Sequence, residues 1–315
     1  LGFPEVQGLG FLPRALEVAR LTERWLAART DTRPFFASIG LWEVHRPWPD
    51  EDYEPADPES VRVPPYLPDN AHTKQDLAHF YGSIRQLDEA INRIVAALRA
   101  APGGDETLII FTTDHGAAFP RAKSTLYDSG VKVALLVSAP ASWAVVPGRR
   151  SEMVSHLDVV PTVLELAGLP RPEELEGVSL LGSLLGENGA PADRVLYLEK
   201  TYHDRYDPIR AVRTRSAKYI RNFAEGPLLP LSADLELSET RRGMGDDHLA
   251  PRPEEELYLL KDDPWELRNV VEDPDCRPLR DELRALLEAH IVASDDPLLQ
   301  GPIPAPPVPD RRATT

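Results

Sequence analysis

Apolar residues recur at helical spacing in three segments of the chain, with charged residues between them. These segments are residues 14–29, 74–100 and 278–292. Because the apolar period is close to that of an α-helix, we predict three amphipathic helices, each with one face packed against a core. Pro102 and Gly103 follow the longest segment, and they predict the end of its helix.

Short apolar runs rich in β-branched residues alternate with the first two helices. They cover residues 35–41, 108–112 and 131–138. Helices that alternate with buried strands are typical of an α/β fold, in which crossover helices connect parallel strands. We therefore predict a mostly parallel central sheet in this part of the chain.

Short strands replace this alternation towards the C-terminus. We expect four of them, at residues 194–198, 209–214, 218–222 and 256–260, the second and third as an antiparallel pair. The predicted organisation is a large α/β domain over residues 1–190, a smaller α+β subdomain with a short antiparallel sheet over residues 191–296, and a proline-rich tail over residues 297–315.

Composition and charge restrict the possible partners. The 315 residues carry a formal net charge of −16, with 35 Lys and Arg against 51 Asp and Glu. This charge excludes general nucleic-acid binding, because the neutralisation of phosphates needs an excess of cationic side chains. A local cationic pocket for an anionic substrate remains compatible with it.

Cysteine content and hydropathy restrict the chain further. The single cysteine, Cys276, excludes an internal disulfide bond and a cysteine-based zinc site. No apolar run reaches the roughly 18 residues of a transmembrane helix. The first residues show no signal-peptide pattern, so the sequence assigns no compartment.

Asp114 and His115 directly follow the strand predicted at residues 108–112. The ligands of α/β sheets bind at the carboxyl ends of strands, and a carboxylate is a hard oxygen ligand for a divalent cation. The imidazole of His115 is either a second metal ligand or a donor to a bound anion. The alternative is structural: Asp114 caps the next segment and His115 packs.

Three side chains in the predicted loops suit an anionic substrate. Lys123 is a compact point charge suited to a sulfate or phosphate oxygen, or else it is simply solvated. His45 follows the strand predicted at residues 35–41. One possibility is that His45 acts on the substrate, as a hydrogen-bond donor to the anion or as the general acid for the leaving group. The other is that it is an ordinary loop histidine. Arg46 either assists it or is solvated.

A further group of polar side chains lies at residues 199–213, where His203 and Arg210 stand out. In a pair of strands, alternate side chains point to opposite faces of the sheet. His203 and Arg210 therefore either reach a substrate pocket or only stabilise the small subdomain.

Several runs, in their order along the chain, resemble the type I sulfatases of the alkaline-phosphatase-like superfamily. The runs that carry the resemblance are IIFTTDHG, RAKSTLYDSG, HLDVVPTVLELAG, GVSLL and ELYLLKDDPWELRNV. Within the family, FPRAKSTLY, VHR, DPIRAVRT and DDPLLQG look most like the N-sulfoglucosamine sulfohydrolases (heparan N-sulfatases or sulfamidases) and their bacterial relatives.

The resemblance implies a fold and a chemistry. The fold is an α/β alkaline-phosphatase-like sandwich with a mostly parallel central sheet and a smaller C-terminal α+β subdomain. The substrate is a sulfated sugar or another sulfate ester. One Ca²⁺ ion is held by side chains of which two match Asp114 and His115, while Lys123 and His45 match catalytic side chains that contact the sulfate. The nucleophile is a formylglycine made from the cysteine of a C-x-P-S-R motif.

The first part of the family pattern is not found in this sequence. No segment before Glu17 offers the first strand, the other metal-binding aspartates or C-x-P-S-R, so we expect an N-terminally truncated, inactive piece of a sulfatase. The run CRPLR at Cys276 satisfies the shorter pattern C-x-P-x-R, but no apolar strand precedes it. We expect a chance match, and peptide mass spectrometry that finds formylglycine at Cys276 would contradict this expectation.

Two alternatives remain open. The first is a phosphoric ester hydrolase of the same superfamily, in which Asp114 and His115 bind zinc. The second is a non-catalytic protein that binds sulfated sugars. A sheet that lacks its first strands has an open edge and exposed apolar surface, and we therefore expect this chain to aggregate or to form a homodimer.

Overall fold

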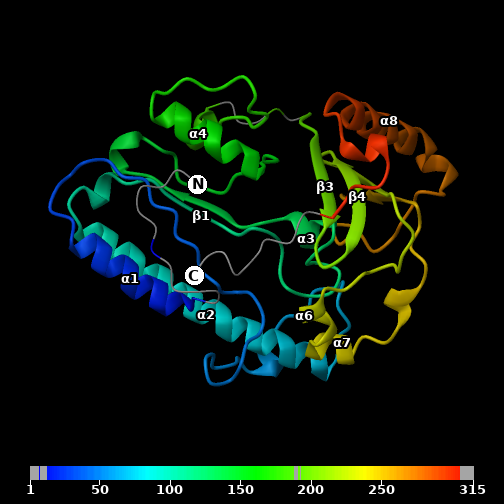
Figure 1. The fold of residues 1–315 in the computed structure, drawn as a ribbon, viewed down its shortest axis with the longest axis horizontal. Coiled ribbons are helices and arrows are strands. Elements are labelled where there is room, and N and C mark those ends of the chain that lie inside the picture. Colours follow the sequence, from blue (N-terminus) through cyan, green and yellow to red (C-terminus); the bar gives the residue numbers. More distant parts are fainter. Residues whose placement is uncertain (1–6, 8–12, 188–190, 192, 306–315) are drawn as a thin grey trace. The chain divides into compact units, whose positions relative to one another are not determined.

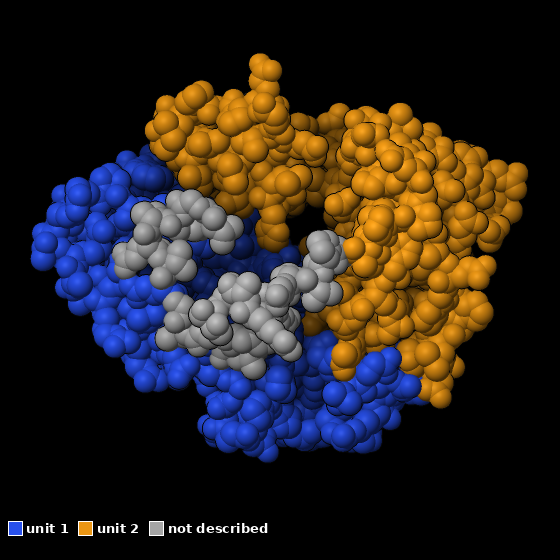
Figure 2. Space-filling view, viewed as in Figure 1, with its two compact units in different colours: residues 1–120, 132–146, 234–245 blue, residues 121–131, 147–233, 246–315 orange. Residues whose placement is uncertain are grey.

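The computed structural model describes residues 7, 13–187, 191 and 193–305. The chain folds into two compact units (Figure 2). Unit 1 contains Leu1–Pro120, Lys132–Val146 and Asp234–Gly245, and unit 2 contains Arg121–Val131, Pro147–Ala233 and Asp246–Thr315. Over the described residues, no helix combines the length and the apolar character needed to cross a membrane.

Unit 1 contains two long helices that pack side by side (Figure 1). α1 spans Ala15–Ala27 and α2 spans Ala71–Ala100, which confirms two of the helices expected from the apolar pattern. Small side chains at their contact, among them Ala19 and Ala90, are fully buried and allow the helix axes to approach closely. The side chain of Asn70 caps α2 by accepting a hydrogen bond from a backbone N–H of the first turn.

The strands of unit 1 correct one prediction. β1 (Ile109–Thr112) pairs with β2 (Leu135–Ser138) in an antiparallel direction, and residues 35–41 are not a strand. Both sheets of the described residues are antiparallel, so the mostly parallel central sheet is not found among them. A parallel pair needs a crossover of about a dozen residues or more, usually a helix. The chain between β1 and β2 contains only the four-residue α3 (Asp128–Val131).

Some large apolar side chains of unit 1 are exposed. Phe36 is 70% exposed and Leu136 is 61% exposed. Exposed apolar surface favours association when it is contiguous. The expected self-association of the chain stays a prediction.

A four-stranded antiparallel sheet lies at the centre of the C-terminal part of unit 2, with α8 beside it (Figure 1). The strands are hydrogen-bonded in the order of the chain, which confirms the antiparallel pair and the later strand expected from the sequence. They are β3 (Leu196–Tyr202), β4 (Tyr206–Arg213), β5 (Ala217–Asn222) and β6 (Glu255–Leu259).

The core of this sheet is covered by α8 (Arg277–Ala293), the third expected helix. Leu283 and Leu287, one turn apart on α8, pack against Tyr219 of β5 and Leu257 of β6. All four side chains are at most 1% exposed, so the helix and the sheet share one apolar core. The domain boundary expected near residue 190 stays a prediction.

Shorter elements complete the described chain. The helices are α4 (Val159–Leu166), α5 (Leu181–Leu184), α6 (Ala233–Glu236) and α7 (Glu239–Arg242). Single 3₁₀ turns lie at Pro58–Ser60, Gly104–Glu106, Ala141–Trp143, His156–Asp158, Asp247–Leu249, Pro274–Cys276 and Pro297–Gln300. Most of the expected tail, residues 306–315, lies outside the described residues.

Candidate functional site

The loop that carries His45 is attached to α1 through a buried carboxylate. Glu43 is 6% exposed, and its Oε2 accepts a hydrogen bond of 2.8 Å from Ala15 N at the first residue of the helix. Its Oε1 accepts a hydrogen bond of 2.7 Å from the hydroxyl of Tyr53. A negative charge at the N-terminus of a helix stabilises the helix. The carboxylate of Glu43 also holds the start of the loop against α1.

His45 has a defined orientation and tautomer. Its Nδ1 lies 2.6 Å from the carbonyl oxygen of Arg46. Because a carbonyl only accepts, Nδ1 must donate, and in the neutral ring Nε2 carries the lone pair. The ring packs against Trp42, with 4.3 Å between centroids. The bond at Nδ1 therefore sets which nitrogen carries the proton in the neutral ring.

Arg46 is 7% exposed, and its guanidinium is hydrogen-bonded to protein groups. It is therefore neither solvated nor available to a ligand. Its two terminal nitrogens donate to the carboxylate of Asp76 at 2.8 and 2.7 Å, and its Nε donates to Ala118 O at 2.8 Å. The guanidinium also lies 4.1 Å from the ring centroid of Trp48. Arg46 thus connects the His45 loop, α2 and the segment that follows Asp114.

Asp76 also receives bonds from a distant part of unit 1. Its Oδ2 accepts from Thr240 N at 3.1 Å and from the Thr240 hydroxyl at 2.6 Å. Asp76 is 4% exposed and Thr240 is fully buried. Neither residue was recognised from the sequence, because nothing in a helical apolar pattern indicates the partner of a buried polar side chain.

Asp114 and His115 lie in the same unit as His45. The Nδ1 of His115 lies 2.7 Å from Gly116 O, so this ring also donates from Nδ1 and keeps its Nε2 lone pair. That Nε2 is 3.5 Å from Asp114 Oδ2, and the Asp114 side chain is 86% exposed. A carboxylate oxygen of an exposed side chain and the Nε2 of a half-buried imidazole are thus adjacent.

The carboxylate of Asp114 and the imidazole of His115 are side chains of the kinds that bind metal ions. Calcium takes about six to eight oxygen ligands. Within residues 7, 13–187, 191 and 193–305, no group of three or more His, Cys, Asp or Glu side chains could hold a metal ion. The role of Asp114 and His115 as metal ligands therefore stays a prediction, and among the described residues no third His, Cys, Asp or Glu side chain joins them.

Lys123 belongs to unit 2, in the loop of residues 121–131. It is 4% exposed, so it is not the solvated lysine that was the alternative. Arg121 and Ser124 on either side of it have positive φ angles of 60° and 64°, which are uncommon for residues with side chains. The conformation of the backbone around Lys123 is therefore specific to this loop.

Arg210 and His203 have different surroundings in unit 2. Arg210 is 4% exposed and donates to Asp296 from Nε at 2.6 Å and from a terminal nitrogen at 3.1 Å. Burial would raise the pKa of Asp296, but the hydrogen bonds and charge of Arg210 outweigh it and lower this pKa. His203 is more exposed, with Nδ1 3.2 Å from Asp204. The role of both residues at a substrate remains a prediction.

Cys276 is a free, half-buried cysteine. It packs, with Leu279, against the apolar core shared by α8 and the sheet. It directly precedes α8 at the end of a 3₁₀ turn.

Comparison with known proteins gives matches along most of the chain. The family model described as "Sulfatase" matches residues 16–169, and the model described as "N-sulphoglucosamine sulphohydrolase, C-terminal" matches residues 118–234. An ulvan-active sulfatase of Formosa agariphila is 30% identical over 255 residues, which cover 74% of this chain and 41% of that protein. The human N-sulphoglucosamine sulphohydrolase is 27% identical over 338 residues, which cover 90% of this chain and 65% of that protein. The chain thus spans about half the length of such relatives.

Solved structures show the same fold. A 2-O GAG sulfatase matches with a TM-score of 0.59 and 20% identity, over 96% of this chain and 69% of that one. The phosphonate monoester hydrolase of Agrobacterium radiobacter matches with a TM-score of 0.64 and 20% identity, over 89% of this chain and 62% of that one. The two family models, found in the expected order, agree with this fold, and the chain belongs to the sulfatase family.

Proposed function

We propose that this chain is part of a sulfatase that hydrolyses the sulfuric ester or sulfamate group of a sulfated sugar such as N-sulfoglucosamine. The observation that carries the proposal is the bond from Arg46 to Ala118 O, which ties the His45 loop to the segment that follows Asp114 and His115. The names of the relatives support the substrate class, since one of them acts on N-sulphoglucosamine.

In this proposal, His45 supplies the proton for the leaving group. An oxygen nucleophile bonds to sulfur as the bond from sulfur to the sugar nitrogen or oxygen breaks. The electron pair of the broken bond stays on the sugar atom, which takes a proton from Nε2 of protonated His45. The hydrogen bond from Nδ1 to Arg46 O holds the ring in one orientation during this transfer. The ammonium group of Lys123 offsets the negative charge of the sulfate oxygens.

Asp114 and His115 would hold the metal ion, for which we propose calcium because a carboxylate is a hard oxygen ligand. A metal ion at this point would polarise the sulfate oxygens. We further propose that Cys276 stays a thiol, because its side chain packs against an apolar core, and that the family's parallel sheet and remaining ligands come from outside the described residues.

A second candidate function is the hydrolysis of phosphoric or phosphonic esters. It is favoured by the similarity of fold to the phosphonate monoester hydrolase. In that case Asp114 and His115 would bind zinc. A non-catalytic protein that binds sulfated sugars is the third candidate, and the same experiments distinguish it.

Binding of N-sulfoglucosamine, measured by calorimetry in the presence of calcium, tests the proposal. We expect wild-type binding, and we expect Lys123→Ala to weaken it about 10- to 100-fold, since a hydrogen bond to a charged group contributes about 1.5–3 kcal/mol. Lys132→Ala is the matched control, because Lys132 is an exposed lysine nearby in the sequence and should leave the affinity unchanged.

Sulfate release from N-sulfoglucosamine and from an aryl sulfate then separates the candidates. We expect little turnover by this chain, because its described residues contain no group of three or more His, Cys, Asp or Glu side chains that could hold a metal ion. Strong turnover would contradict the proposed inactivity. Zinc-dependent release of phosphate or phosphonate, without affinity for N-sulfoglucosamine, would replace the sulfatase proposal by the second candidate.

A further inference from the structure

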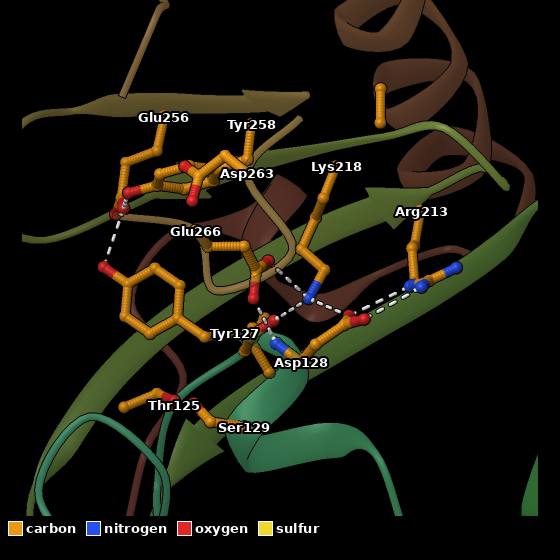
Figure 3. A network of polar contacts seen from close by, with 12 residues as sticks. Thr125, Tyr127, Asp128, Ser129, Arg213, Lys218, Glu256, Tyr258, Asp263 and Glu266 are labelled. Carbon is orange, nitrogen blue, oxygen red and sulfur yellow. Dashed lines mark hydrogen bonds and ion pairs between the residues drawn. The ribbon is translucent and has the colours of Figure 1, made fainter. Parts of the chain in front are cut away.

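The loop of residues 121–131 is held by side chains from all four strands of the unit 2 sheet. From β3, Lys200 Nζ donates to Ser124 O at 2.8 Å. The hydroxyl of Tyr127 donates to Glu256 of β6 at 2.7 Å. β4 and β5 contribute through the ionic cluster that Figure 3 shows around Asp128. The loop that carries Lys123 therefore has anchors on both sides of that residue.

Lys218 of β5 is the centre of the ionic cluster. It is fully buried, and its Nζ lies 2.6 Å from Asp128 Oδ1 and 2.7 Å from Glu266 Oε1. The same nitrogen donates to Leu126 O at 2.9 Å. Figure 3 shows its side chain pointing between the two carboxylates. One ammonium group thus donates a hydrogen bond to a loop carbonyl and pairs with two carboxylates, and two of these three partners lie in the loop.

The register of β4 and β5 places two cationic side chains opposite each other, so an anion is needed between them. Arg213 of β4 lies directly opposite Lys218 of β5, and like charges in such a pair repel each other. Asp128 resolves the conflict, since it also accepts two hydrogen bonds from Arg213, at 2.9 and 2.8 Å. Burial would raise the pKa of Asp128, but the contacts with Arg213 and Lys218 outweigh it and hold this pKa well below its ordinary value.

Glu266 completes the attachment of the loop. Its Oε2 accepts from Asp128 N at 2.5 Å, and its backbone carbonyl accepts from the guanidinium of Arg121. Burial raises the pKa of Glu266 above its ordinary value. Inside the loop, Gly130 lies so close to Ala122 that an added Cβ would be 2.4 Å from its carbonyl oxygen. The loop is therefore both tightly folded and tied to the sheet.

We propose that Lys218 is a positioning residue for Lys123. The left-handed conformations of Arg121 and Ser124 persist only where surrounding contacts determine them, and the bonds of Lys218 to Leu126 and Asp128 are such contacts. Lys218 does not touch the substrate; it keeps the ammonium group of Lys123 in place for the anion. This inference rests on the proposed sulfate-binding role of Lys123.

The test compares Lys218→Met with Arg194→Met. Both variants remove a cation of unit 2 from a buried carboxylate, but the side chain of Arg194 is 11% exposed, and its hydrogen bonds go to Met153 and Asp158 and not to the loop. The first measurement is the rate of trypsin cleavage after Arg121 and Lys123 in the folded protein. The second is the affinity for N-sulfoglucosamine, in the single variants and in the double variant with Lys123→Ala.

We expect Lys218→Met to raise cleavage in the loop at least tenfold and to weaken N-sulfoglucosamine binding at least tenfold, while Arg194→Met changes neither to that extent. The double variant should bind no more weakly than Lys123→Ala alone, because a positioning residue acts only through its target. If Lys218→Met does not fold, Glu266→Gln is the milder variant, and we expect smaller changes in the same direction.

The outcomes keep this inference separate from the proposed function. Wild-type protein that does not bind N-sulfoglucosamine contradicts the proposed function, and loop cleavage alone then decides whether Lys218 holds the loop. Equal cleavage in Lys218→Met and Arg194→Met overturns the inference. So does a double variant that binds much more weakly than Lys123→Ala.

Discussion

Replacing Arg46 by methionine should destabilise the protein by about 3–5 kcal/mol, the cost of removing one partner of a buried ion pair. The carboxylate of Asp76 would keep its bonds from Thr240 but lose both bonds from the guanidinium. A charge that is 4% exposed would then have no cation beside it. Urea denaturation, followed by the fluorescence of the tryptophans, measures the change.

Two control variants sharpen this prediction. Arg33 pairs with Asp31 at 2.9 Å, but its side chain is 86% exposed, and Arg33→Ala should leave the free energy of unfolding close to that of the wild type. The double variant Arg46→Met with Asp76→Leu should recover part of the loss, because it leaves no unpaired buried charge. A loss below about 1 kcal/mol in Arg46→Met would show that Arg46 does not stabilise unit 1 in the way described.

The substitution Asp158→Asn should have a comparable effect in unit 2, again about 3–5 kcal/mol. Asp158 is fully buried. Its carboxylate accepts two hydrogen bonds of 2.7 Å from Arg194, and others from Ser155 N at 2.7 Å and Val178 N at 2.8 Å. The amide would leave the guanidinium of Arg194 without its anion.

The cost of Asp158→Asn should depend on pH. Burial would raise the pKa of Asp158, but the hydrogen bonds from Arg194, Val178 and Ser155 outweigh it and lower this pKa. Because the pKa is lower in the folded state than the ordinary value of about 3.9, the ionised carboxylate stabilises the fold above that pH, and this contribution is lost as the pH falls below it. The difference between wild type and variant should therefore shrink below about pH 4.

Asp281 provides the comparison for this experiment. Its side chain is 51% exposed, and its partners, Arg280 and Arg284, lie on the same helix. Asp281→Asn should change the free energy of unfolding by less than about 1 kcal/mol. A pH-independent cost of Asp158→Asn would mean that the charge of Asp158 does not contribute to stability.

Local patterns in the sequence predict the helices well. α1, α2 and α8 each carry an apolar stripe that is long enough to define a period. The direction in which two strands pair cannot be predicted in this way, because an apolar run such as that of β1 carries no information on which strand it pairs with. The expected parallel sheet was wrong for the described residues for this reason.

The candidate site could be found only where its residues form a motif. His45, Asp114, His115 and Lys123 lie in short runs that resemble the family. The residues that support them are far apart in sequence, as Arg46 and Asp76 are, 30 positions from each other. Lys218 is the first residue of the strand predicted at residues 218–222, but its partners could be recognised only in the fold.

The two histidines of the site have one more consequence, for nuclear magnetic resonance. Each ring is oriented by a carbonyl one residue further along its own backbone, Arg46 O for His45 and Gly116 O for His115. The protonated nitrogen is thus set by a few consecutive backbone atoms and does not require a distant partner. The ¹⁵N shifts of both imidazoles should accordingly show the minor, Nδ1-protonated tautomer of free histidine, and two unusual resonances would make the pair visible without any bound ligand.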